Sequence, residues 1–178
     1  MNQFSLSANI ETGFPEGSQY IVTPNAKKVL AEIVNGYQSG IHSYTIIGTY
    51  GTGKSSFLIA LQNDLSGRSK KKYIFDNIDV LGCEKVETLN IVGDYASLPL
   101  LLSRKLNIEG DTASVLDALR AYCSKLNAKN TFLVIMIDEF GKVLEHAAKK
   151  DPESELKKKK KLAEFANVPT RKVLLLTT

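Results

Sequence analysis

One short segment, Gly48 to Ser55, constrains this chain more than any other part of it. The segment reads GTYGTGKS and fits the pattern G-x-x-x-x-G-K-[ST]. Residues 44–47 before it are a short, β-branched run typical of a buried strand, and residues 55–65 after it carry apolar side chains at helical spacing. A strand, a glycine loop and a helix in this order predict a loop that binds the phosphates of a nucleoside triphosphate.

Each part of this Walker A pattern has a chemical reason. Gly48 and Gly53 permit backbone angles that a Cβ would obstruct, so that successive N–H groups can converge on phosphate oxygens. Lys54 is expected to bind the β and γ phosphates, and Ser55 is expected to offer its hydroxyl to Mg²⁺. The remaining residues expected to contact the nucleotide are Thr49, Tyr50, Gly51, Thr52 and Ser56.

A second motif follows the most hydrophobic run of the chain. Residues 132–137 read FLVIMI, and Asp138 and Glu139 come directly after them. A run without alternation predicts a strand covered on both faces, which would deliver Asp138 to the edge of the sheet where ligands bind. As in a Walker B motif, we expect Asp138 to hold Mg²⁺ and Glu139 to act as the general base that activates water. The alternative for Glu139 is a solvated carboxylate at the start of a loop.

Strands and helices alternate along the chain, which predicts an α/β, three-layer P-loop NTPase fold with a mainly parallel sheet. Further strands are predicted at residues 86–92 and 173–176, and a short helix is favoured at residues 73–81. Longer helices are predicted after Thr23-Pro24 and at residues 98–106, 112–126, 140–149 and 152–166.

The last predicted strand ends in Thr177 and Thr178. We expect it to lie between the loop strand and the Asp138 strand, where a threonine hydroxyl could sense the γ-phosphate or orient the attacking water. The alternative is that both residues simply fill a strand, which threonine prefers.

Composition and charge limit the cellular locations and partners that we expect for the protein. Neither an apolar membrane span nor a secretion signal is visible, and the two cysteines have no metal-binding spacing, so we expect a cytoplasmic protein. We divide the chain into an N-terminal arm, residues 1–22, and a P-loop ATPase core, residues 23–178. The basic stretch from Lys149 to Lys161 could contact nucleic acid or an acidic partner, although a solvated helix face is the commoner meaning of such a run.

Together, GTYGTGKSSF and FLVIMIDEFGK resemble the motifs of additional-strand P-loop ATPases, which include AAA+, STAND-like and origin-recognition ATPases. A closer resemblance is to the N-terminal ATPase region of large bacterial proteins, some of them in phage-defence or restriction-type operons. In those proteins a Y-x-x-T-P segment precedes the glycine loop, and IDExGK is followed by a helix carrying LAE. The corresponding segments here are Tyr20 to Pro24, Ile137 to Lys142 and Leu162 to Glu164.

The resemblance implies several properties. The nucleotide would be ATP with Mg²⁺, with Tyr20 and Ile21 near the adenine and Thr177 or Thr178 at the sensor position. An extra strand would separate the loop strand from the Asp138 strand, a role that we assign to residues 86–92. Members of the family continue into a fifth strand and a helical lid, so the chain is expected to be part of a larger protein that associates with itself or with other proteins.

We therefore expect Mg-dependent ATP hydrolysis by the motor or switch domain of a larger, possibly DNA-associated, assembly. The alternative is a nucleotide-gated binding module with little intrinsic hydrolysis. A phosphotransferase is a third hypothesis, but such an enzyme has no need of the Asp138-Glu139 pair.

Overall fold

The computed structural model describes residues 9–16, 20–67, 72–75, 81–150 and 152–178. Its strands form one four-stranded, fully parallel sheet in the order β1-β4-β3-β2. The strands are β1 (Ser43–Thr45), β2 (Lys85–Val92), β3 (Thr131–Asp138) and β4 (Val173–Thr177). The helices are α1 (Pro24–Gln38), α2 (Lys54–Leu65), α3 (Leu98–Leu106), α4 (Thr112–Asn127), α5 (Phe140–Lys150) and α6 (Pro152–Ala166).

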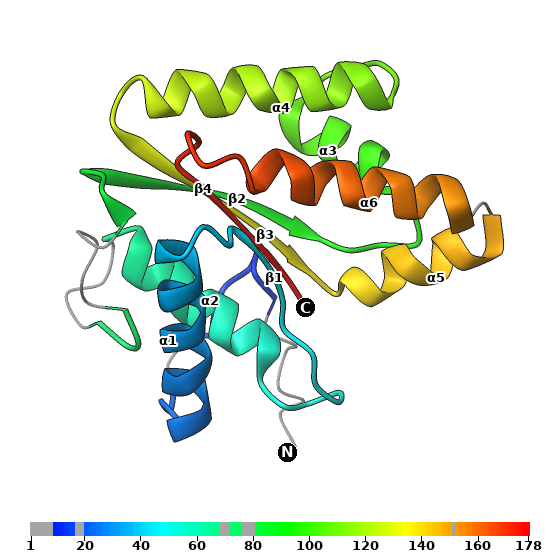
Figure 1. Ribbon diagram of the computed structural model, residues 1–178. Coiled ribbons are helices and arrows are strands. Elements are labelled where there is room, and N and C mark those ends of the chain that lie inside the picture. Colours follow the sequence, from blue (N-terminus) through cyan, green and yellow to red (C-terminus); the bar gives the residue numbers. More distant parts are fainter. Residues whose placement is uncertain (1–8, 17–19, 68–71, 76–80, 151) are drawn as a thin grey trace.

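Helices cover both faces of the sheet. Figure 1 shows α1 and α2 on one face and α3, α4 and α6 on the other, while α5 continues from the end of β3. The three-layer α/β architecture predicted from the alternation of strands and helices is therefore confirmed. In the part of the chain that the structure describes, no helix has the length and apolar character needed to cross a membrane.

The central strand β3 explains why its sequence shows no alternation. All eight of its residues are buried. Leu133, Ile135 and Ile137 pack into the core beneath α3, α4 and α6. Phe132, Val134 and Met136 pack into the core beneath α1 and α2. Because successive side chains point to opposite faces, a strand covered on both faces reads as one continuous apolar run.

Strand β4 lies between β1 and β3, as the sequence predicted for the strand that ends in Thr177. In the register of the sheet, Thr177 is opposite Thr45 on one side and Ile137 on the other. The carboxyl ends of these three parallel strands therefore meet at one edge of the sheet. That edge carries the end of the glycine-loop strand and the Asp138-Glu139 pair.

The role assigned to residues 86–92 is wrong. Among the described strands, β2 pairs with β3 alone and forms the far edge of the sheet, so β4 is the strand that separates β1 from β3. The exposed Lys85 and Glu87 at the start of β2 suit this position, because charged side chains protect an edge strand from pairing further.

The strand before the glycine loop is shorter and more exposed than predicted. β1 contains three residues, and the Ile46 N–H adds one more hydrogen bond to the Thr177 carbonyl at 2.8 Å. Ile47 is 90% exposed, so the prediction of a buried strand over residues 44–47 is wrong. The reason is that β1 has a neighbour on one side only and the chain leaves the sheet directly after it to form the loop.

Side chains cap the starts of two of the predicted helices. Thr23 Oγ1 accepts a hydrogen bond from the Ala26 N–H at 3.1 Å, and Pro24 occupies the first turn of α1. Asp111 Oδ1 accepts from the Ser114 N–H at 2.9 Å at the start of α4, and this hydrogen bond lowers the pKa of Asp111. The helix favoured at residues 73–81 does not include residues 73–75, while residues 76–80 lie outside the described residues.

Part of the N-terminal arm packs against the domain. Ile10 is 1% exposed and belongs to the core beneath α1 and α2, and its carbonyl accepts a hydrogen bond from Asn90 Nδ2 at 3.4 Å. Glu11 forms an ion pair of 2.9 Å with Lys105. Both partners, Asn90 and Lys105, are distant from residues 10 and 11 in the sequence, so these contacts attach this part of the arm to the domain.

Candidate functional site

The glycine loop has the backbone that its sequence requires. Gly51 and Gly53 have φ values of 79° and 86°, in the left-handed region that residues with a Cβ rarely adopt. Gly48 is not among the glycines with positive φ, but a Cβ there would lie 2.9 Å from Thr52 Oγ1 and would displace that side chain. Gly53 precedes the first residue of α2, so the positive end of that helix lies at the loop.

Lys54 is held at the loop by main-chain carbonyls. Its Nζ donates hydrogen bonds to the carbonyls of Gly48 and Thr49, both at 2.9 Å, and Thr52 Oγ1 also donates to the Thr49 carbonyl at 2.8 Å. The loop therefore folds around the lysine ammonium, which lies beside the N-terminus of α2. This concentration of positive charge suits a phosphate group.

The two predicted motifs meet at the Asp138 carboxylate. Ser55 Oγ donates to Asp138 Oδ1 at 3.0 Å, and Thr178 Oγ1 donates to the same oxygen at 2.7 Å. Asp138 is only 1% exposed, and its buried Oδ2 has no hydrogen-bond partner among the residues that the structure describes. Burying a carboxylate oxygen without a partner is costly, so Asp138 Oδ2 points to a ligand that the protein itself does not supply.

These donors fit a magnesium ion. Mg²⁺ prefers oxygen ligands and commonly takes one or two protein oxygens together with phosphates and water. Ser55 and Asp138 supply a hydroxyl and a carboxylate beside the glycine loop, which is the set predicted from the sequence. Groups of three or more His, Cys, Asp or Glu side chains that could hold a metal ion are absent from the described ranges, so this site would depend on oxygens from the nucleotide and from water.

Glu139 occupies a strained turn between β3 and α5. Its φ is 54°, which is uncommon for a residue with a side chain. The Glu139 N–H donates to Asp138 Oδ1 at 3.0 Å and to Thr178 Oγ1 at 3.1 Å. These contacts hold the turn, and the Glu139 carboxylate forms an ion pair with Lys142, three residues further along the chain.

Sequence reasoning missed the importance of Gly93, which directly follows the strand predicted at residues 86–92. Its N–H donates to the Asp138 carbonyl at 2.7 Å. A Cβ on Gly93 would lie 2.4 Å from the Glu139 carbonyl oxygen, closer than any packing allows. The signal available in the sequence was a glycine immediately after a predicted strand, at the edge where the Asp138 strand also ends.

Thr177 and Thr178 have different surroundings. Thr177 is 4% exposed, and its Oγ1 donates to Thr45 Oγ1 at 2.9 Å, away from the carboxylates. Thr178 alone contacts Asp138 and the Glu139 backbone. Of the two threonines predicted at the sensor position, only Thr178 is placed beside the predicted catalytic groups.

A cleft of about 320 Å³ opens beside the glycine loop. Tyr20 and Ile21 line it, together with Gly48, Gly53 and Lys54 of the loop. The Tyr20 ring also contacts the rings of Phe14 and Tyr73 at centroid distances of 6.0 and 6.1 Å, and burial raises the pKa of its hydroxyl. The structure thus brings Tyr20 and Ile21 close to the loop, although their contact with adenine stays a prediction.

Two other residues predicted to contact the nucleotide, Tyr50 and Ser56, do not line this cleft. Tyr50, at the tip of the loop, is 97% exposed. Ser56 lies in the first turn of α2 and is partly buried. Their predicted contacts with a nucleotide stay predictions.

Several lysines of the basic stretch from Lys149 to Lys161 contact acidic or aromatic side chains of the domain. Lys158 forms an ion pair with the buried Glu155, and Lys160 lies 3.7 Å from Glu164. The ammonium groups of Lys149 and Lys159 lie over the rings of Tyr95 and Phe140, respectively. The stretch is therefore not one continuous band of free lysines.

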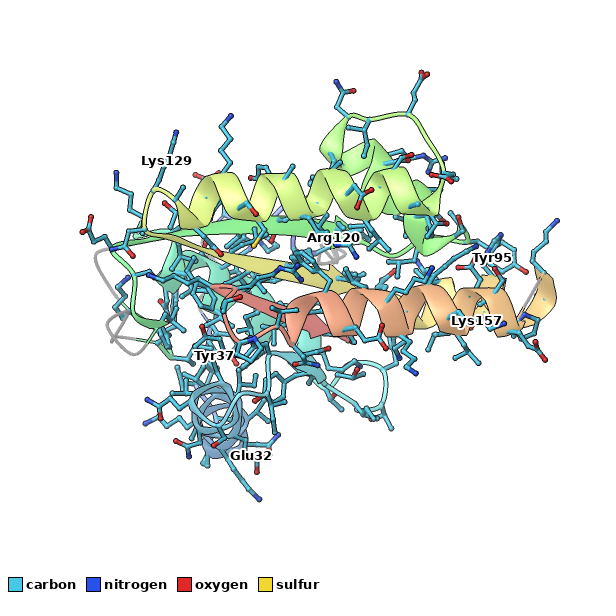
Figure 2. The ribbon with its side chains drawn as sticks, turned by 45° about the horizontal axis from the view of Figure 1, so that its top comes forward. Glu32, Tyr37, Tyr95, Arg120, Lys129 and Lys157 are labelled. Atoms are coloured by element: carbon cyan, nitrogen blue, oxygen red, sulfur yellow. The ribbon has the colours of Figure 1, made fainter. Side chains whose placement is uncertain are left out.

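A second hollow, of about 400 Å³, lies between α4 and α6, in the layer opposite the glycine loop. Lys161, Arg120 and Arg171 line it along with Asp117 and Glu164. In Figure 2, Arg120 lies between these two helices, whereas Tyr95 and Lys157 lie towards one end of the layer. Because the hollow combines both signs of charge, it does not specify a ligand.

Comparison with solved structures finds several similar chains, among them two structures of the Aeropyrum pernix ORC2 protein. One structure contains ADPNP-ADP complexes and the other is an ADP form. Each is 18% identical in sequence over 90% of this chain, with TM-scores of 0.43 and 0.47. The alignment covers 44% and 43% of those chains, so this chain spans less than half of their length. No protein-family model and no curated protein matches the sequence.

Proposed function

We propose that this chain binds ATP with Mg²⁺ and hydrolyses the nucleotide, as the motor or switch domain of a larger, possibly DNA-associated, assembly. The observation that carries the proposal is the cluster of Ser55, Asp138 and Thr178 beside the glycine loop. In this cluster one carboxylate oxygen holds two hydroxyl groups and the other is buried without a partner. Such an assembly could form through self-association or with other proteins.

The residues of the loop would bind and orient the phosphates. The N–H groups at the start of α2 and the Lys54 ammonium would exchange their present contacts for phosphate oxygens, with the lysine leaving the carbonyls of Gly48 and Thr49. When bound, Mg²⁺ would neutralise charge on the phosphates, and Ser55 and Asp138 would hold it.

Glu139 would accept the proton of the attacking water. A carboxylate that follows β3, which β4 separates from the loop strand β1, can hydrogen-bond a water that approaches the γ-phosphate in line. Two contacts to its backbone N–H and the close approach of Gly93 fix the turn that presents the side chain. Thr178 supports the same turn through the Glu139 backbone and Asp138.

Adenine is the base that suits the cleft best. Its lining offers the faces of Tyr20 and the apolar side chains of Ile21, Val29 and Ile47. None of the described residues that line it is Asp or Glu, whose two carboxylate oxygens could accept from both the exocyclic amine and the ring N–H of guanine, and Asn25 offers a single amide oxygen. We therefore favour ATP over GTP. The two free, buried cysteines are consistent with a reducing compartment such as the cytoplasm.

Phosphate release by the wild-type chain and by Glu139→Gln tests the proposal. We expect Mg-dependent turnover in the wild type and a loss of at least about 100-fold in kcat in the variant. Binding of a fluorescent ATP analogue should change little, because Glu139 does not line the cleft. If Glu139→Gln hydrolyses ATP as fast as the wild type, the assigned role of Glu139 is wrong.

A second candidate is a nucleotide-gated module that binds ATP and barely hydrolyses it. The observation that favours it is the ion pair that engages the Glu139 carboxylate with Lys142. Single-turnover measurements with ATP in complex with the chain separate the two candidates. Rapid release of phosphate would exclude the second one, and tight binding without release would exclude the first.

A further inference from the structure

Three aromatic rings from different parts of the chain meet beside the cleft. Phe14 comes from the N-terminal arm, Tyr20 lines the cleft, and Tyr73 follows α2. The Tyr20 ring is stacked on Phe14 with a centroid distance of 6.0 Å and an interplanar angle of 25°, and it meets Tyr73 edge-on at 6.1 Å. Phe14 and Tyr73 contact each other at 6.3 Å. Each ring of this aromatic cluster therefore contacts both of the others.

Tyr73 is attached to the helix that follows the glycine loop. Its backbone N–H donates to Asp64 Oδ1 at 2.8 Å, and Asp64 is buried in α2. Lys54 is the first residue of the same helix. One ring of the aromatic cluster is thus fixed to the element that begins at the proposed phosphate site.

Phe14 is held by a tight turn of the arm. Gly13, with a φ of 77°, donates its N–H to the Asn9 carbonyl at 2.8 Å, and Asn9 Oδ1 accepts from the Glu11 N–H at 2.9 Å. The Glu11 carboxylate forms its ion pair with Lys105 on α3, in the layer opposite the loop. The turn therefore brings Phe14 to the cleft from a part of the domain that does not carry the glycine loop.

Tyr20 lies outside the described helices and strands, four residues before α1. The position of a ring in such a segment depends on what packs against it, and two of its neighbours are the rings of Phe14 and Tyr73. A side chain that is already fixed before a ligand arrives loses less conformational freedom on binding. Its two neighbours therefore prepare Tyr20 to pack against a planar base.

We propose that Phe14 positions Tyr20 for the base of the nucleotide and so couples docking of the arm to nucleotide binding. This inference rests on the proposed binding of ATP in the cleft and adds a residue that acts through Tyr20. By reciprocity, bound nucleotide strengthens the docking of residues 9–16 by the same factor. A partner protein that competed with the domain for the arm would weaken nucleotide binding without touching the cleft.

The main test is Phe14→Leu, which keeps an apolar side chain and removes the ring. Contacts between aromatic rings correspond to roughly two- to tenfold in an equilibrium, so the Kd of a non-hydrolysable ATP analogue should rise by that factor in calorimetry. KM for ATP should rise equally while kcat at saturating ATP stays unchanged. Phe14→Tyr should retain the wild-type affinity because it keeps the ring.

Two further measurements distinguish positioning of Tyr20 from general support of the fold. Inorganic tripolyphosphate with Mg²⁺ has no base, so Phe14→Leu should bind it as tightly as the wild type does. Phe14→Leu should also have no further effect on the affinity for the ATP analogue when Tyr20 is already leucine. Phe165→Leu removes a buried ring in the opposite layer and is the matched control, expected to lower stability with the Kd of the analogue unchanged.

Gly13→Ala tests the arm without altering a ring. A Cβ there meets nothing within 4 Å, so alanine only strains the turn that presents Phe14, and the affinity for the analogue should fall. Gly40→Ala, with the same strain at a φ of 88° beyond the far end of α1, should leave the affinity unchanged. Hydrogen exchange of residues 9–16 should slow when the analogue binds to the wild type, and less so in Phe14→Leu.

The outcomes separate this inference from the proposed function. If the wild type binds the analogue and Phe14→Leu binds it equally well, or loses affinity for tripolyphosphate to the same extent, the positioning role is disproved and the proposed function stands. Exchange of residues 9–16 that ignores the nucleotide would disprove the coupling. If Phe14→Leu shows the expected selective loss but the wild type releases no phosphate, hydrolysis is disproved and this inference stands. A wild type that binds neither probe disproves both.

Discussion

Thr178 and Asp138 are joined by a hydrogen bond of 2.7 Å from the threonine hydroxyl to the carboxylate oxygen Oδ1. The neighbouring Thr177 points to the other side of β4 and donates to Thr45 at 2.9 Å. Alternation along one strand therefore gives two adjacent threonines different surroundings. This separation allows the chemical role and the structural role of the strand end to be tested independently.

We expect Thr178→Val to lower kcat for ATP hydrolysis by about tenfold. The substitution preserves shape but removes one hydrogen bond to the Asp138 carboxylate and one acceptor for the Glu139 N–H. Hydrogen bonds to charged groups are worth about 1.5–3 kcal/mol, which corresponds to a factor of about ten or more if they are lost in the transition state. The measurement is steady-state phosphate release.

Thr177→Val is the matched control for this prediction. It removes the contacts of the hydroxyl with Thr45 Oγ1 and the Tyr44 carbonyl, and it should lower the free energy of unfolding by about 1 kcal/mol with kcat nearly unchanged. Equal losses of kcat in both variants would show that Thr178 has no special role.

Gly93→Ala should lower the free energy of unfolding by about 3 kcal/mol. Its Cβ would meet the Glu139 carbonyl oxygen at 2.4 Å, and the backbones of β2 and β3 would have to separate at their ends. Chemical denaturation measures this change, and the same variant should hydrolyse ATP more slowly because the Glu139 turn is displaced.

Gly141→Ala provides the control for Gly93→Ala. Nothing lies within 4 Å of a Cβ at Gly141, which is exposed within α5. Alanine favours a helix over glycine, so this variant should gain about 0.5–1 kcal/mol of stability. If both alanine variants change the free energy of unfolding in the same way, the close approach of the Glu139 carbonyl is not the reason for glycine at position 93.

The central features of the fold could be predicted because they depend on local patterns. The residues of β3 form an uninterrupted apolar run since both faces are covered, and GTYGTGKS specifies its own backbone through Gly51 and Gly53. Capping by Thr23 and Asp111 also depends on residues close in sequence. The position of a strand within the sheet does not depend on residues close in sequence. For this reason β2 was assigned to the wrong place, because its pairing with β3 is a long-range property.

The residues of the candidate site also fall into those that local motifs predict and those that only the structure identifies. Lys54, Ser55, Asp138 and Glu139 belong to motifs with recognisable chemistry, so the sequence named them. Gly93 contacts the Glu139 backbone in space, and no motif marks it. Lys142 belongs to the IDExGK segment, but the sequence did not indicate its ion pair with Glu139. For the paired threonines, the direction of each side chain depends on the register of β4 against β1 and β3.

A buried aspartate in α2, missed by the sequence analysis, should be important for stability. Asp64 is 2% exposed, and its carboxylate accepts hydrogen bonds from the N–H groups of Tyr73, Ile74 and Phe75 at 2.7–2.9 Å. Asp64→Asn replaces one of the acceptor oxygens with a donor that faces other donors. We expect the free energy of unfolding to fall by about 2–3 kcal/mol in chemical denaturation.

Asp117→Asn is the comparison for Asp64. Asp117 forms an exposed ion pair with Arg120 on α4, so its loss should cost less than about 0.5 kcal/mol. Tyr73 also touches the Tyr20 ring, so a displaced 73–75 segment in Asp64→Asn should weaken binding of the ATP analogue as well. Full stability in Asp64→Asn would mean that the three N–H groups find other partners.

Contact with nucleic acid, if the basic stretch makes it, should depend on Lys157 and Lys161. Neither of these lysines forms an ion pair within the described ranges, whereas Lys158 and Lys160 are paired with glutamates. We expect the double variant Lys157→Ala and Lys161→Ala to weaken binding of a fluorescent oligonucleotide and to reduce the slope of log K against log salt by about 1–2. The control removes two lysines that are already paired, Lys28→Ala and Lys160→Ala, and so changes the net charge equally. Equal slopes for both double variants would show that only net charge matters, and a slope unchanged from that of the wild type would exclude this surface as the contact.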